Sequence, residues 1–112
     1  MQIRKTYKEV NPELLYNELR DFTLKQGAIV GESRLETYSL PGGSSHVSRG
    51  TLSFDNKEGT GRKCLRAHIV GSAASETKLM LDIDQNLFSQ GKVSSFQNDL
   101  DFMLGSYEIK PN

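Results

Sequence analysis

The residue types that carry nucleophilic or metal chemistry are few in this sequence. Cys64 is the single cysteine, and His46 and His68 are the two histidines. Cys64 and His68 lie four positions apart in an alternating segment, so on a strand they share a face with their Cα atoms roughly 13 Å apart. That distance excludes a direct nucleophile and base pair, and these three residues fall short of a structural zinc set. We therefore predict no metal ion and no cofactor, with Cys64 a half-buried thiol and His68 a surface imidazole.

Two further features have the composition of a catalytic or binding site. Asp82 and Asp84 lie two positions apart on another expected strand, so they share a face. Their Cα atoms would be roughly 6 to 7 Å apart, a spacing that glycosidases use. No third group accompanies the pair, so it is interpreted as solvated surface. The Gly-Gly-Ser-Ser stretch at residues 42–45 lacks the lysine and helix start of a phosphate-binding loop and is interpreted as a hairpin loop. No catalytic residue is predicted, and a binding protein is favoured over an enzyme.

Composition limits the class of protein. A length of 112 residues predicts a single domain, residues 1–112. Fourteen basic and fourteen acidic side chains cancel, so a nucleic acid or an anionic partner would need a local patch. No apolar run reaches the roughly 18 to 20 residues of a bilayer span, no signal-peptide core follows the N-terminus, and the lone cysteine has no disulfide partner. These features predict a cytoplasmic protein with no membrane partner.

The first helix has clear start and stop signals. Asn11 can accept hydrogen bonds from the free N–H groups of a first turn, and the proline after it suits the first helical position. Leu15, Leu19 and Phe22 then form one apolar stripe. Gly27 supplies the left-handed stop, so a helix is expected between Asn11 and Gly27.

Strand-like alternation surrounds this helix. One short strand is expected before it and four after it, at residues 2–10, 28–40, 47–54, 62–70 and 77–84. In the last three strands, the side chains expected to face the core are Leu52, Phe54, Leu65, Ala67, Ile69, Leu79, Leu81 and Ile83. Those expected to face outward are Thr51, Ser53, Cys64, Arg66, His68, Lys78, Met80 and Asp82. One buried and one polar face is typical of an antiparallel sheet covered on one side.

A second amphipathic helix closes the sequence. Val93, Phe96, Leu100 and Met103 recur at spacings of three, four and three, and Gly105 can end the helix. Its start is expected between residues 84 and 89. The sequence thus predicts an α+β fold of β-α-β4-α order, in which a curved antiparallel sheet carries two helices on one face.

This order of elements resembles that of the helix-grip and TATA-binding-protein-like folds. The resemblance runs from Ile3 to Leu104 and consists of topology, without a specific motif. It implies a sheet that wraps against the final helix. Proteins of this layout include carriers of apolar small molecules, lipid-transfer domains, cyclases, chaperone-stimulating modules and a DNA-binding saddle.

The main functional hypothesis is a non-enzymatic binding module. It would hold an apolar small molecule in a groove between the last helix and the sheet, or pair with a partner protein. The side chains that would line the groove, and that would otherwise form a filled core, are Phe54, Leu65, Ile69, Leu81, Phe96, Leu100 and Met103.

The alternative hypothesis places the function on the outward face of the sheet. A basic patch there would bind a nucleic acid or another anion. Its expected residues are Arg49, Arg62, Arg66, His68 and Lys78. The sheet of the TATA-binding protein carries intercalating aromatic side chains that this outward set lacks, which makes nucleic acid the less favoured partner.

Overall fold

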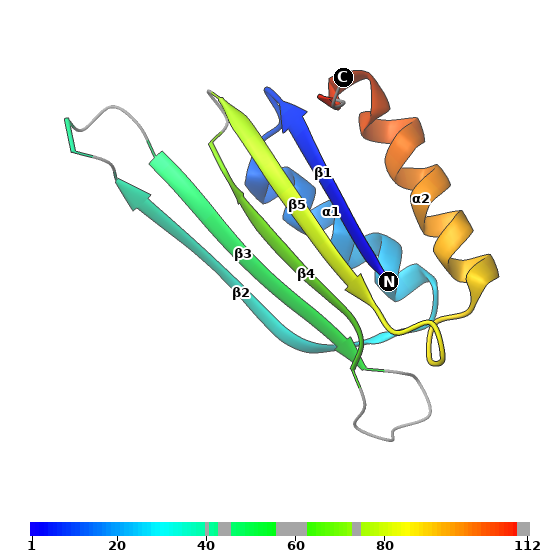
Figure 1. Ribbon diagram of the computed structural model, residues 1–112. Coiled ribbons are helices and arrows are strands. Elements are labelled where there is room, and N and C mark those ends of the chain that lie inside the picture. Colours follow the sequence, from blue (N-terminus) through cyan, green and yellow to red (C-terminus); the bar gives the residue numbers. More distant parts are fainter. Residues whose placement is uncertain (40, 43–45, 56–62, 73–74, 110–112) are drawn as a thin grey trace.

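The computed structural model describes residues 1–39, 41–42, 46–55, 63–72 and 75–109. Five antiparallel strands form one sheet, and two helices pack on one of its faces (Figure 1), which confirms the predicted α+β class. In chain order the elements are β1 (Gln2–Lys8), α1 (Pro12–Lys25), β2 (Ile29–Ser39), β3 (His46–Asp55), β4 (Lys63–Gly71), β5 (Glu76–Ile83), α2 (Gln90–Leu104) and the 3₁₀ turn η1 (Gly105–Tyr107). The loop predicted at residues 42–45 lies mostly outside the described residues, as does Arg62.

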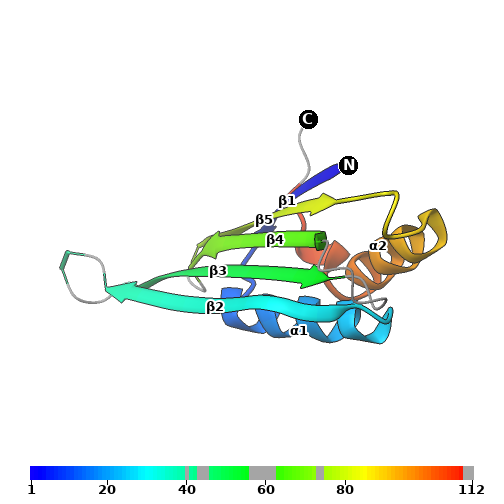
Figure 2. The same ribbon diagram turned by 90° about the horizontal axis from the view of Figure 1, so that it is seen from below.

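The strand order brings the first strand next to the last one. Neighbouring strands follow the order β1-β5-β4-β3-β2, so the first strand pairs with the last and β2 forms the opposite edge. The sheet is twisted but not strongly curled (Figure 2), which differs from the curved sheet that was predicted. Neither helix in the described part of the chain combines the length and apolar character of a bilayer span.

Helix α1 begins as its sequence predicts. The Asn11 side chain accepts a hydrogen bond from the Glu13 N–H at 2.8 Å, and Pro12 occupies the first turn. Leu15 and Leu19 are fully buried against the sheet. After the helix, Gly27 adopts a φ of 93°, a left-handed conformation that glycine reaches without strain.

Helix α2 contains one wrong assignment. Ser89 caps it by accepting a hydrogen bond from the Lys92 N–H, and Val93, Phe96 and Leu100 face the core as predicted. The next inward position is Leu104, however, while Met103 is 44% exposed. A step of four residues from Leu100 keeps Leu104 on the buried stripe, whereas a step of three turns Met103 to the flank.

The prediction that Cys64 faces outward with Arg66 and His68 is also wrong. The register between β3 and β4 shifts next to Phe54, where a β-bulge interrupts the alternation. Such a bulge places two successive side chains on nearly the same side of the strand. Cys64 is therefore 1% exposed and joins Leu65 in the core.

Candidate functional site

The space between α2 and the sheet is filled with side chains. Six of the seven residues predicted to line a groove belong to the hydrophobic core and are at most 1% exposed: Phe54, Leu65, Ile69, Leu81, Phe96 and Leu100. The rings of Phe22 and Phe96 pack edge to face, with ring centroids 6.3 Å apart. The pockets considered below contact this set only through Leu65. These side chains act as core.

The hydrogen-bond partner of the buried thiol among the described residues is a backbone carbonyl. The Cys64 Sγ donates a weak hydrogen bond to the Phe54 carbonyl at 3.4 Å. Burial raises the pKa of the thiol, with a smaller contribution in the same direction from the Asp55 charge. The adjoining cavity, near Gly27 and Phe88, has a volume of about 30 Å³, the size of one water molecule. Among the described residues no group of three histidine, cysteine or acidic side chains could hold a metal ion.

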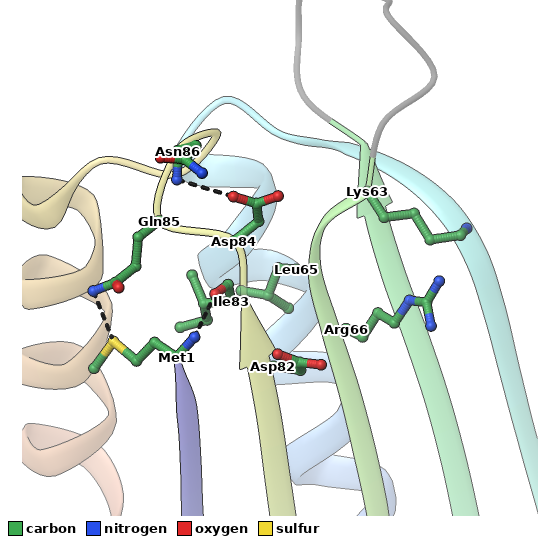
Figure 3. A pocket seen from close by; sticks show the side chains of 9 residues that line it. All are labelled: Met1, Lys63, Leu65, Arg66, Asp82, Ile83, Asp84, Gln85 and Asn86. Atoms are coloured by element: carbon green, nitrogen blue, oxygen red, sulfur yellow. Dashed lines mark hydrogen bonds between the residues drawn. The ribbon is translucent and has the colours of Figure 1, made fainter.

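A larger pocket lies at the end of the sheet where β4 begins and β5 ends (Figure 3). It has a volume of about 520 Å³. Its lining consists of Met1, Lys63, Leu65, Arg66, Asp82, Ile83, Asp84, Gln85 and Asn86. Two cationic side chains and two carboxylates therefore share it with the Met1 ammonium group, which donates a hydrogen bond to the Ile83 carbonyl.

The two carboxylates of this pocket do not act as a pair. β5 ends at Ile83, so Asp84 lies in the following loop and not on the strand face that was predicted. Asp84 accepts a hydrogen bond from the Asn86 N–H at 2.9 Å, which stabilises the turn. Asp82 instead pairs in register with Arg66 of β4, and Figure 3 shows its carboxylate turned away from that of Asp84.

The face of the sheet opposite the helices gathers the remaining predicted cations. Val70 of β4 lies between Arg49 of β3 and Lys78 of β5 in the strand register, and His68 lies next along β4. Arg49 also pairs with Glu36 of β2, which offsets its charge. Arg66 lies opposite Asp82. Of the predicted cations that the structure describes, only His68 and Lys78 therefore lie where no carboxylate is opposite.

Strand β1 contributes two residues that the sequence analysis missed. Arg4 pairs in register with Met80, and Thr6 pairs with Lys78. Because side chains alternate along a strand, Arg4 and Thr6 lie on the same side of β1. Only the pairing of β1 with β5 brings that side next to Lys78 and His68.

These residues surround a shallow pocket of about 380 Å³, which we call the central depression. Its lining consists of Arg4, Lys5, Thr6, His68, Val70, Lys78, Leu79 and Met80. Val70 is 39% exposed and forms an apolar floor with the half-buried Met80. No carboxylate lines the depression, so its charge is positive.

Three of the polar side chains around the central depression have no charged partner in the described part of the chain. Among the described residues, no carboxylate lies within 4 Å of Arg4, His68 or Lys78, and none of the three donates a hydrogen bond. Lys5 differs, because its side chain passes to the other face of the sheet and contacts Glu108 at 3.0 Å. An exposed apolar floor with unpaired cations at its rim is an arrangement suited to an anion that carries an apolar group.

Comparison with known proteins identifies no relative: no family model, no curated protein and no solved structure matches the sequence.

Proposed function

We propose that this protein is a non-enzymatic binding module that holds an amphiphilic organic anion in the central depression. The observation that carries the proposal is the set of three unpaired cationic or polar side chains, Arg4, His68 and Lys78, around the apolar floor of Val70 and Met80. The proposal follows the alternative hypothesis drawn from the sequence, anion binding on the outward sheet face, and adds an apolar group to the ligand. The filled space beneath α2 provides no comparable support for a ligand there.

The expected affinity is modest. Covering roughly 100 Å² of apolar surface stabilises a complex by about 2.5 kcal/mol. Each exposed charge pair adds about 0.2 to 1 kcal/mol. With three such pairs the terms sum to about 3 to 5.5 kcal/mol, which corresponds to dissociation constants from about 5 mM to about 0.1 mM, and the cost of immobilising the ligand weakens binding further.

A relation to the helix-grip or TATA-binding-protein-like folds remains part of the proposal. The order of strands and helices supports it. In a saddle of the TATA-binding type the open sheet face binds DNA through inserted aromatic side chains. The eight residues of the central depression include no such side chain, which favours a small organic anion over a nucleic-acid strand.

The test uses anilinonaphthalene sulfonate, an aromatic sulfonate whose fluorescence rises in apolar surroundings. The double variant Arg4→Gln with Lys78→Gln should weaken its binding about tenfold, which corresponds to 1.4 kcal/mol. The matched control is Arg34→Gln, which removes a cation from β2 on the same sheet face but outside the depression. The control should bind as the unmodified protein does.

Two further titrations test whether binding depends on the negative charge of the ligand and whether a nucleic acid binds better than a small anion. The neutral analogue phenylnaphthylamine should bind more weakly than the sulfonate and should not respond to the double variant. An oligothymidylate should bind no more tightly than the sulfonate at the same salt concentration. Equal sulfonate binding by the double variant and the control would contradict the proposal.

A further inference from the structure

Strand β2 presents a free edge. It pairs with β3 on one side, and within the described part of the chain no strand pairs with its other side. Edge strands in monomeric proteins are commonly short, or carry lysine, proline, bulges or charges that point inward. β2 is 11 residues long and has one bulge, at Gly31. Beyond it, from Glu32 to Ser39, the strand has no lysine or proline.

The same strand is exposed on both faces. Figure 2 shows β2 and β3 extending past the end of α1, so the helix layer does not cover the far half of the hairpin. Leu35, which faces the helix side near Gly50, is 36% exposed, and Tyr38 on the open face is 49% exposed. Exposed apolar side chains beside unpaired backbone groups are a site for pairing with another strand.

We propose that the partner is a second copy of this chain, and that two β2 strands pair antiparallel about a two-fold axis at Leu35. The two sheets, with five strands each, would then form one continuous sheet. Opposite residues in such a pair have numbers that add up to 70. The axis runs perpendicular to the sheet, so both helix layers lie on the same side.

Charge complementarity selects this register. Arg34 lies opposite Glu36 of the second copy, and Glu36 lies opposite its Arg34, so two ion pairs form across the axis. Leu35 meets its own copy, and Ser33 meets Thr37. The adjacent registers are unfavourable, because an axis at residue 34 places Arg34 against itself, and an axis at residue 36 places Glu36 against itself.

The side chains concerned are already at the edge and loosely held. Arg34 Nη1 and Glu36 Oε1 of the same strand are 4.0 Å apart, and the two side chains are 65% and 41% exposed. The Tyr38 hydroxyl donates to the Glu36 carboxylate. Such an exposed pair within one strand contributes little to stability, so exchanging it for a pair across the axis costs little.

The test is the mass of the protein in solution, measured by sedimentation equilibrium between about 1 and 100 μM. The chain has a mass of 12.5 kDa, and twice that mass is expected at the upper end. Arg34→Glu and Glu36→Arg should each weaken the dimer roughly thirtyfold, because each turns both ion pairs into like-charged pairs. The control Arg4→Glu, on the opposite edge strand, should leave the dimer intact.

Rescue experiments make the register specific. The double variant Arg34→Glu with Glu36→Arg restores opposite charges across the axis and should dimerise again. An equimolar mixture of the two single variants should form a heterodimer, since the acidic strand then faces the basic one. A monomeric protein at 100 μM, or single variants that dimerise as the unmodified protein does, would overturn the proposal. Loss of the dimer with Arg4→Glu alone would place the interface at β1 instead.

Discussion

β1 and β2 are the two edges of one sheet, yet their surroundings differ. The outer side of β1 is closed by the segment after α2, where the Ile109 N–H donates to the Thr6 carbonyl at 2.7 Å and Glu108 forms a bridge with Tyr7. No described segment covers the outer side of β2. The chain therefore protects one edge with its own C-terminal segment and leaves the other available.

Charge follows the same division. The Lys5 ammonium contacts Glu108 at 3.0 Å and Asp101 at 3.4 Å, which joins β1 to both α2 and the closing segment. Burial disfavours the charged ammonium, but the hydrogen bond and charge of Glu108, with Asp101, outweigh it and raise the pKa of Lys5. On β2 the charged side chains of Glu32 and Arg34 are exposed and that of Glu36 is half-buried, so all three are accessible to a partner. One sheet can thus use the same backbone geometry for closure at one edge and for recognition at the other.

The largest expected effect is a difference between the two edges in how much a charged side chain contributes to the free energy of unfolding. Lys5→Met removes the ammonium but keeps most of the aliphatic stem, which leaves the mostly buried Glu108 carboxylate without its cation. The free energy of unfolding should fall by roughly 2 kcal/mol. The control Arg34→Met on β2 should change it by less than about 0.5 kcal/mol. Urea denaturation at protein concentrations below dimer formation measures both, and equal effects would show that the two edges do not differ in this way.

A smaller effect concerns two buried tyrosines. The Tyr16 hydroxyl hydrogen-bonds to Ser33 of β2, so Tyr16→Phe should cost about 1 kcal/mol of stability. The Tyr7 hydroxyl on β1 is buried with no hydrogen-bond partner among the described residues. Tyr7→Phe should therefore be neutral or stabilise the protein by up to about 1 kcal/mol. Thermal unfolding of both variants tests this, and a Tyr7→Phe variant less stable than Tyr16→Phe would contradict it.

The smallest expected effect is a loss of stability at alkaline pH that is absent near neutral pH. Burial raises the pKa of Tyr7, as do the charges of Glu108 and Asp101, and the pKa values of Lys5 and Cys64 are raised as well. A group whose pKa is higher in the folded state contributes stability below its ordinary pKa and loses it as pH rises through the folded value. The free energy of unfolding should thus be level near pH 7 and fall above about pH 9.

Two phenylalanine variants assign this alkaline loss. Tyr7→Phe should make the fall in the free energy of unfolding above about pH 10 shallower. Phenylalanine has no proton to lose, so the unfolded state no longer gains stability by ionising at this position. Tyr38→Phe on β2 is the matched control. The hydrogen bond to Glu36 raises the pKa of Tyr38, but this side chain is exposed, so its removal should alter the slope less. Denaturation curves between pH 7 and pH 11 provide the comparison, and identical slopes for both variants would count against a special role of β1.

Much of the local structure could be predicted because it depends on neighbouring residues. The cap at Asn11, the stripe of Leu15 and Leu19 and the alternation of Leu79, Leu81 and Ile83 are all found in the structure. The errors arose where a partner element decides the outcome. Cys64 turned inward because β4 bulges against β3, and Asp84 left its strand because β5 ends one residue earlier.

The candidate site was predicted only in part. His68 and Lys78 were in the expected basic patch, and the structure keeps them together. Arg66 is instead beside Asp82, and Arg4 joined the patch from the other end of the chain. Periodicity indicates which way a side chain points from its own strand, but it does not indicate which strand lies next to it.

The sequence by itself determined the helices, the strands and the inward or outward direction of most side chains, since these follow from backbone sterics and the spacing of apolar residues over a few positions. The tertiary structure alone decided that β1 lies beside β5, that the space beneath α2 is filled, and that Glu108 and Ile109 pair with the edge at β1 while no described segment pairs with the outer side of β2. The physical reason is that these features depend on contacts between residues distant in the chain. Several strand orders satisfy the same local pattern, and packing of the whole core selects among them.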